Sequence, residues 1–287
     1  METTHPSFDP RQEMRAPDYE VFHYCESAPL NVAVHHHDFY EIYFFLSGDV
    51  EYDIEGRGYQ LEPGNLLLVS PLELHQLRVR SAREPYNRIV LWMNPGYLSG
   101  LSTAGVSLTR CFDHGRAGHT NCLRLDRAQD SRVHAILDQL VEESGGERYA
   151  SGLCARGLLM QLLVEVNRLA LEHAPAPDTP PADSEVSRVV EYINGHYHEK
   201  LSLDELAELF FISKFHLAHQ FQRVVGTSVY RYIMLKRLQM AKQMLRAGVP
   251  PTDVFRNCGF SDYPNFYRAF KRQYGVSPKE FADWIRG

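Results

Sequence analysis

Two hydrophobic patterns divide the chain. Between Tyr19 and about Met93, apolar and polar residues alternate in segments such as EIYFF and VEYDI, and the turn sequences SGD, EGRG and EPGN separate these segments. Alternation of this kind is typical of β-strands with one buried face. The pattern predicts an antiparallel sandwich or barrel over residues 19–93.

After Asp126 the apolar residues recur at helical spacing. One stripe consists of Val133, Ile136, Leu137, Leu140 and Val141, and the next of Leu158, Leu159, Leu162, Leu163, Val166 and Leu169. The spacing predicts two helices that follow the β region and pack on it. As a second hypothesis, one of these helices also forms the seam of a homodimer.

A proline-rich segment, HAPAPDTPPAD, follows at residues 173–183 and disfavours helix and strand alike. We therefore place a domain boundary there. The predicted organisation is an N-terminal arm (1–18), a β-rich domain with its two helices (19–172), a linker (173–183) and a second domain (184–287).

The second domain contains an internal repeat. FQRVVGTSVYRY, which begins at Phe221, and FKRQYGVSPKEF, which begins at Phe270, share Phe, Arg, Gly, Ser and an aromatic residue, each displaced by 49 positions. A constant displacement predicts a duplicated supersecondary unit. Each copy reads as two short helices with a turn between them, the second helix capped by Ser213 in the first copy and by Ser261 or Asp262 in the second. The domain is therefore predicted to be all-α, with two helix-turn-helix units.

The second helix of each unit has a polar face opposite its buried aromatic residues, and we predict that this face binds DNA. Arg268 is the best candidate for reading a base, because its fork fits guanine O6 and N7, whereas Lys and Arg elsewhere suit phosphates. The alternative is that these are ordinary surface charges. The predicted DNA-binding residues are Lys214, Phe215, Ala218, His219, Gln222 and Arg223, and then Tyr263, Pro264, Tyr267, Arg268, Lys271 and Arg272.

A single helix is predicted between the units, from Tyr230 to Ala247. At 1.5 Å per residue it is about 27 Å long. Successive major grooves on one face of B-DNA lie about 34 Å apart. With the width of the units added, one chain reaches two adjacent grooves.

Charge and composition narrow the possible partners. The net charge of the 287 residues is -6, yet residues 184–287 hold 15 Lys and Arg against 10 Asp and Glu, which indicates a polyanion partner for that domain alone. Five cysteines without a C-x-x-C pair argue against a disulfide framework and a zinc finger. No apolar run is long enough for a membrane helix and no signal layout is present, so we expect a soluble cytoplasmic protein without membrane association.

At these motifs the second domain resembles the AraC/XylS family of bacterial transcription regulators. The resemblance rests on LSLDELAELFFISKFHLAHQFQRVVGTSVYRYI, KRLQMAKQML and CGFSDYPNFYRAFKRQYGVSPKEF, and it covers about Ser187 to Ile285. It implies double-stranded DNA as partner, RNA polymerase as a further one, and base contacts at Phe215, Ala218 and His219 and at Tyr263, Pro264, Tyr267 and Arg268. Phe255 departs from the pattern, because the family usually has a small residue there.

The first domain resembles the cupin-like effector-binding domain of the same family. HHHDFYEIYFFLSG and LEPGNLLLVSPLELH match the cupin layout at His35, His37, Glu41 and Gly48, with a later His75. The inward-facing candidates for effector binding are His35, His37, Glu41, Tyr43, Tyr52, His75, Arg88 and Trp92. Aromatic faces beside His and Glu suit a sugar or another polyhydroxylated molecule, although a structural core accounts for half of these residues equally well.

The sequence thus predicts an α+β two-domain chain: a cupin-like β-barrel with two following helices, and two helix-turn-helix units joined by a long helix. Its expected function is effector-controlled transcription regulation as a homodimer, without catalysis or a cofactor. The alternative is a metal-dependent cupin enzyme fused to a DNA-binding module, with the metal on His35, His37, Glu41 and His75. The arm before Tyr19 is either disordered or, as the resemblance implies, closes over bound effector.

Overall fold

The computed structural model describes residues 13–27, 31–71, 73–81, 83–103, 105–114, 116, 118–172 and 185–286. The chain forms two compact units, residues 1–54 with 58–180 and residues 55–57 with 181–287. The predicted linker and the first twelve residues of the predicted arm lie outside the described residues. In the part that is described, every helix is too short or too polar to cross a bilayer.

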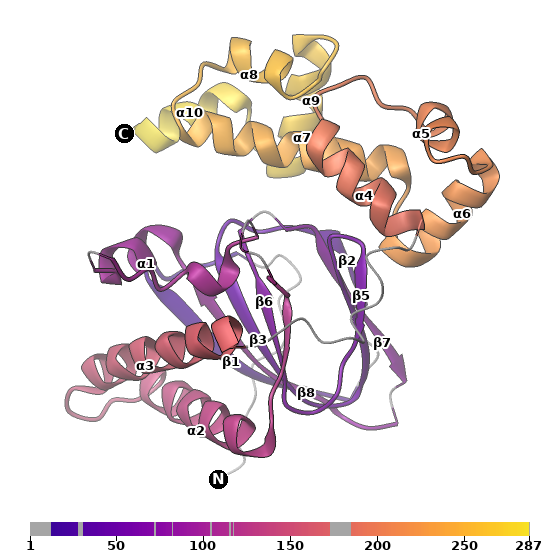
Figure 1. Cartoon of the computed structure of the whole chain (residues 1–287). Helices are drawn as coiled ribbons and strands as arrows, with labels where there is room; N and C mark the ends of the chain where they lie inside the picture. Colours follow the sequence, from indigo (N-terminus) through magenta and orange to yellow (C-terminus); the bar gives the residue numbers. More distant parts are fainter. Residues whose placement is uncertain are drawn as a thin grey trace. The chain divides into compact units, whose positions relative to one another are not determined.

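Two antiparallel sheets make up most of the first unit (Figure 1). The five-stranded sheet has the order β1 (Tyr19–Glu26), β8 (Tyr86–Met93), β3 (Tyr40–Ser47), β6 (Asn65–Val69) and β9 (Cys122–Arg124). The four-stranded sheet has the order β2 (Asn31–His35), β7 (His75–Ser81), β4 (Asp49–Ile54) and β5 (Arg57–Gln60).

Alternate side chains of β3 belong to two different hydrophobic cores. Ile42 and Phe44 face the helices that cover the five-stranded sheet, whereas Tyr43 and Phe45 belong to the core between the two sheets, which we call the barrel interior. The central strands of this sheet are therefore buried on both faces. Strands of this kind are more apolar than strands that expose one face to solvent. The same alternation directs Glu41 into the barrel interior.

Helices α2 (Arg127–Ser144) and α3 (Ser151–Glu172) pack together beside the five-stranded sheet (Figure 1). Asp126 starts α2 with a capping box, in which its side chain and that of Gln129 each bond the other residue's backbone N–H. These are the two predicted helices. The alternation argument did not predict α1 (Pro95–Leu101), the 3-10 turn at Arg110–Phe112 or β9.

Residues 185–286 of the second unit form helices and no strands, as predicted. Its helices are α4 (Glu185–His196), α5 (Leu203–Leu209), α6 (Lys214–Val225), α7 (Val229–Arg246), α8 (Pro251–Asn257), α9 (Tyr263–Tyr274) and α10 (Pro278–Arg286). The two helix-turn-helix units are α5 with α6 and α8 with α9, and α7 is the long helix between them (Figure 1).

The glycine and serine of the repeat are helix caps. Gly226 and Gly275 end α6 and α9 in the left-handed conformation, with φ of 75° and 76°. Two residues later, Ser228 and Ser277 each accept a backbone N–H of the following helix. Because a side chain disfavours positive φ, each unit needs glycine where its second helix must stop.

The aromatic positions of the repeat are core positions: Phe221, Phe270, Tyr232 and Phe281 are all buried. The remaining shared residues, Arg223 and Arg272, are exposed in the last turns of α6 and α9. Packing therefore explains the aromatic residues, and the two arginines lie at helix C-termini, where the helix dipole favours a cation.

Candidate DNA-binding and effector-binding sites

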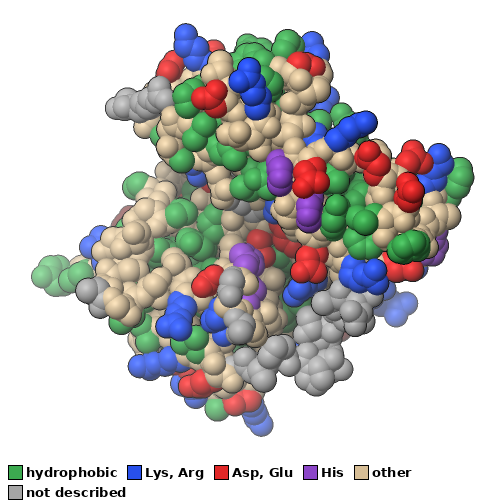
Figure 2. Space-filling model, turned by 45° about the horizontal axis from the view of Figure 1, so that its top comes forward, with side chains coloured by type: hydrophobic (Ala, Val, Ile, Leu, Met, Phe, Trp, Pro, Cys, Tyr) green, Lys and Arg blue, Asp and Glu red, His purple; other side chains and the backbone are tan. Residues whose placement is uncertain are grey.

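Helices α6 and α9 each bury one face and leave the other in solvent. Ten of the twelve predicted DNA-binding residues are exposed, and Ala218 and Tyr263 are half-buried. Figure 2 shows Lys and Arg side chains spread over the second unit, with hydrophobic side chains exposed between them. The structure thus brings each predicted set onto one helix face, and contact with DNA stays a prediction.

A short chain of hydrogen bonds orients Arg268. Its Nη2 donates to Asn265 Oδ1 at 2.5 Å, and Asn265 Nδ2 donates to Asp262 Oδ2 at 2.7 Å. The other oxygen of Asp262 caps α9 by accepting Asn265 N–H. The guanidinium is therefore held at the N-terminal end of α9, the end of a recognition helix that contacts base edges.

In the first helix-turn-helix unit, two of the predicted DNA-binding residues also make contacts within the protein. Lys214 Nζ lies 3.1 Å from Asp204 Oδ1 on α5. Gln222 Nε2 donates to the carbonyl oxygen of Gly226 at 3.0 Å, so Gln222 helps to end its own helix. Phe255, the departure from the family pattern, lies edge-on to Tyr263 with ring centres 5.9 Å apart.

A basic groove beside α9 was missed by sequence reasoning. Its volume is about 1250 Å³, and its lining includes Lys200, Arg237 and Arg256 together with Arg268 and Arg272. Lys200, Arg237 and Arg256 lie outside the two recognition helices, so the spacing of residues along those helices does not predict them. Arg237 also donates to two backbone carbonyls in the loop before α5.

The barrel interior encloses a small cavity of about 20 Å³. It is lined by Tyr24, Val32, His35, Glu41, Tyr43, Tyr52, Leu77, Tyr86, Arg88, Val90 and Trp92. Six of the eight predicted effector-binding residues are in this set. The other two, His37 and His75, are buried and contact its members, since His37 lies beside Glu41 and the His75 ring stacks on Tyr52.

Glu41 is a buried carboxylate with several partners. It accepts hydrogen bonds from Tyr52 Oη at 3.0 Å and from Trp92 Nε1 at 2.8 Å. Burial acts to raise the pKa of Glu41, but His37 and the Trp92 N–H act more strongly in the other direction, and the net shift is downward. The side chain is therefore charged at neutral pH.

Arg88 carries the opposite charge and is 1% exposed. Its guanidinium lies 4.7 Å from the ring centre of Tyr24 and 4.0 Å from that of Tyr86, and Nη1 lies 2.5 Å from Glu26 Oε2. Burial raises the pKa of Tyr24 to about 12, so this ring stays neutral. Tyr24 and Tyr86 were not among the predicted residues, although Tyr24 continues the alternation of its strand and pairs with Arg88 across the sheet.

Three histidines donate Nδ1–H to backbone carbonyls. The acceptors of His35, His37 and His75 are Ala33, Phe39 and Glu73, at 2.9, 2.9 and 2.8 Å. A carbonyl oxygen only accepts, which fixes the proton on Nδ1. Burial lowers the pKa of His35 to about 4 and that of His75 well below its usual range, so both rings are neutral with Nε2 as a lone-pair donor.

Three of the four predicted metal ligands come together. One ligand atom each from His37, Glu41 and His75 lies within 4.8 Å of the others, and all three residues are buried. His35 is outside this group, although its ring centre is 4.1 Å from that of His75. Nitrogen ligands whose second ring nitrogen bonds a carbonyl fit a first-row transition-metal ion.

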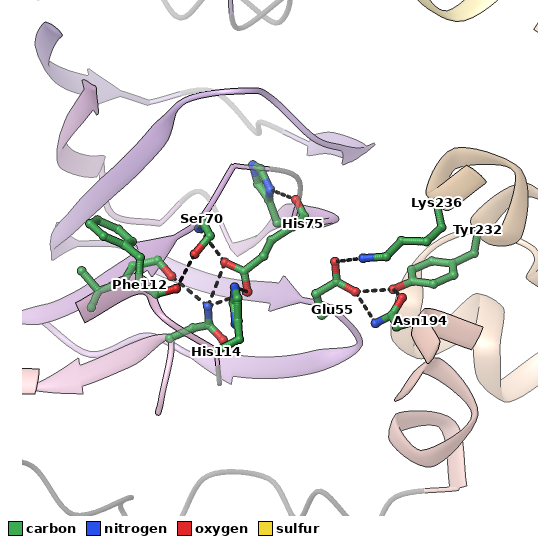
Figure 3. A network of polar contacts seen from close by, with 11 residues as sticks. Glu55, Ser70, His75, Phe112, His114, Asn194, Tyr232 and Lys236 are labelled. Carbon is green, nitrogen blue, oxygen red and sulfur yellow. Dashed lines mark hydrogen bonds and ion pairs between the residues drawn. The ribbon is translucent and has the colours of Figure 1, made fainter. Parts of the chain in front are cut away.

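A polar network lies next to His75 (Figure 3). The Glu73 carboxylate accepts the backbone N–H of Ser70 at 2.6 Å and the side-chain amide of Asn121 at 2.8 Å, and His114 Nε2 lies 3.5 Å from it. The backbone carbonyl of Glu73 is the acceptor of His75. The network thus fixes the loop that orients the His75 ring.

Comparison with known proteins identifies both units. A family described as AraC-like ligand binding domain matches residues 20–163, and a helix-turn-helix domain family matches residues 206–283. The chain belongs to the AraC family. It is a transcription regulator with a ligand-binding domain and a helix-turn-helix domain that binds DNA, as the resemblance implied.

Relatives agree over most of the chain. The arabinose operon regulatory protein of Escherichia coli K12 is 30% identical over 79% of this chain and 74% of its own length. The HTH-type transcriptional activator RhaS of Escherichia fergusonii is 25% identical over 86% of each chain. Among solved structures, ToxT from Vibrio cholerae O395 covers 95% of this chain at 12% identity, with a TM-score of 0.38.

Replacing Arg268 and Lys271 separates base reading from phosphate binding. Arg268→Ala is expected to lose about 1 to 3 kcal/mol at particular base pairs and to relax preference there, because its fork is lost. Lys271→Ala is expected to weaken all duplexes about equally and to lower the salt slope by about one. Gel-shift titrations at several salt concentrations measure both. Equal losses on all duplexes for both variants would contradict the assignment.

Proposed function

We propose that a polyhydroxylated small molecule, such as a sugar, binds in the barrel interior and controls how this regulator occupies DNA. The observation that carries the proposal is the buried cavity, where Glu41, Arg88 and several tyrosine hydroxyls surround one space. Charged and hydroxyl groups among aromatic faces match the donors, acceptors and C–H faces of a sugar. The arabinose operon regulatory protein among the relatives supports the same class of effector.

The cavity must open for such an effector to enter. Its volume of about 20 Å³ holds one water molecule, whereas sites for small molecules measure about 300–1,000 Å³. Effector binding therefore displaces lining side chains and favours a second arrangement of the barrel. A difference of about 1.4 kcal/mol in effector affinity between two arrangements changes their ratio tenfold.

Thermal melting with a panel of sugars and sugar acids tests the proposal. We expect at least one compound to raise the melting midpoint and to change DNA affinity in a gel shift. Tyr52→Phe should weaken the response because it removes a cavity hydroxyl, and Tyr97→Phe, which removes a hydroxyl outside the cavity lining, should retain it. A midpoint that no compound of the panel moves would refute effector control by this class.

The outer face of α3 is the proposed dimer seam. Leu153, Met160 and Leu171 are exposed and Val164 is half-buried, with spacings of seven, four and seven residues. Such spacing forms the apolar stripe of a coiled coil. We propose that two copies pair along this stripe, that the dimer binds DNA in the cytoplasm, and that it acts on RNA polymerase.

Sedimentation tests the seam. The wild-type protein should sediment as a species with twice the 33.0 kDa mass of one chain. Met160→Glu should shift it toward one chain, because a charge then lies in the apolar contact. Val106→Glu, at an exposed apolar residue outside α3, should leave the dimer intact. A Met160→Glu variant that remains fully dimeric excludes this face.

A second candidate function is metal binding at His37, Glu41 and His75. Among the described residues, Nε2 of His37 and of His75 make no hydrogen bond, although both side chains are buried. His37 Nε2 lies 3.4 Å from Glu41 Oε2. Two ligands of a tetrahedral Zn²⁺ at about 2.1 Å lie about 3.4 Å apart, which matches this pair. We propose that the three residues hold one divalent first-row transition-metal ion.

Metal content and cobalt spectroscopy test this site. Full-length protein stripped with chelator and titrated with Co²⁺ should bind one ion per chain, with d–d absorption and a raised melting midpoint. His75→Ala and Glu41→Gln should lose the absorption, and His134→Ala, at a histidine outside the group, should keep it. Absence of bound ion in wild-type protein, or retention in His75→Ala, rejects the site and with it a metal-dependent enzyme.

A further inference from the structure

The turns of the two helix-turn-helix units share one backbone. Phe210 after α5 has φ -96° and ψ 5°, and Cys258 after α8 has φ -99° and ψ 8°. The next residue has positive φ in both units, 57° at Phe211 and 76° at Gly259. In each unit the N–H of this residue donates to the carbonyl three positions earlier, and the following N–H donates to the carbonyl five positions earlier. The two turns therefore place the same conformational demand on different residues.

Glycine meets that demand and phenylalanine does not. A side chain in the left-handed conformation costs stability, most of all a bulky one. At Gly259 glycine is required, because an added Cβ would lie 2.6 Å from the backbone oxygen of His198. At Phe211 the ring is 95% exposed, so burial within the described protein does not offset the cost of its backbone. Packing gives no reason for phenylalanine at this position.

Phe211 lies at the end of α6 that faces DNA in a helix-turn-helix. It stands two residues before Ser213, the N-cap of α6, and recognition helices contact bases through their N-terminal residues. Phe215 in the first turn of the same helix is 80% exposed, with Lys214 Nζ 5.9 Å from its ring centre. Figure 2 shows exposed hydrophobic side chains beside charged ones on the part of the molecule formed by α5 and α6. Both exposed rings thus belong to residues at the N-terminal end of α6, four positions apart in the chain.

We propose that Phe211 is a specificity-determining DNA contact of the first helix-turn-helix unit. Its ring would pack against thymine methyl groups or deoxyribose. The inference rests on the DNA-binding function of the chain and adds a residue outside both recognition helices. A strained residue kept without internal contacts is typical of a binding site. Its position favours DNA over a protein partner, because Phe211 stands two residues before the N-cap of a recognition helix, and helix N-termini contact phosphates. Ala218, a small residue on α6, leaves room for apolar groups of the base pairs.

Substitution at Phe211 should change stability and DNA affinity in opposite directions. The probe is the duplex that full-length wild-type protein enriches from a random-sequence pool. Phe211→Gly should raise the melting midpoint by a few degrees, because the strain is relieved, and weaken binding of this duplex about tenfold. Phe211→Asn, which tolerates positive φ, should also weaken binding, and Phe211→Trp should retain it.

Sequence preference distinguishes a specific contact from general weakening. A second selection with Phe211→Gly should lose preference in the half of the site read by α6 and keep it in the half read by α9. Unchanged affinity and preference in Phe211→Gly would overturn the proposal and assign the ring to a protein partner. A wild-type chain that enriches no sequence would overturn the DNA-binding function itself.

Discussion

Each recognition helix buries a phenylalanine at the same position of the repeat, and the DNA-binding unit depends on this constraint. Phe221 and Phe270 are fully buried, and the faces opposite them stay in solvent. A left-handed glycine and a serine cap then turn the chain into the next helix at the same distance from each phenylalanine. Duplication thus preserved the residues that fix the direction of the helix and left the outward residues free to differ. The outward face of the first helix-turn-helix unit has aromatic and small side chains, whereas that of the second has an oriented arginine.

The barrel faces a different physical problem, because its interior holds charges. Glu41 is stabilised by Tyr52, Trp92 and His37, and Arg88 by two tyrosine rings and Glu26. Buried charges with several partners are tolerated, and removal of one partner is costly. The interior is therefore an ordered polar set in which each charge has several partners.

The parts of the structure that depend on local pattern could be predicted from the sequence. Alternation predicted the strand that carries Glu41 and Tyr43, helical spacing predicted α2 and α3, and the repeat predicted the helix-turn-helix pair. What the sequence did not predict depends on contacts between distant segments. Tyr24 joins the cavity by pairing with Arg88 across strands, and the basic groove gathers Lys200, Arg237 and Arg256 from separate elements. His35 was expected among the metal ligands, and only side-chain geometry places it beside that group.

A single chain carries its two helix-turn-helix units on α7, which should hold the two recognition helices in a fixed register. Hydroxyl-radical footprinting of the full-length protein on a duplex with one binding site measures this register directly. We predict two protected blocks per chain on one face of the duplex, separated by about one helical turn of 10–10.5 base pairs. One protected block per chain, or two blocks whose separation varies from site to site, would contradict the rigid double module.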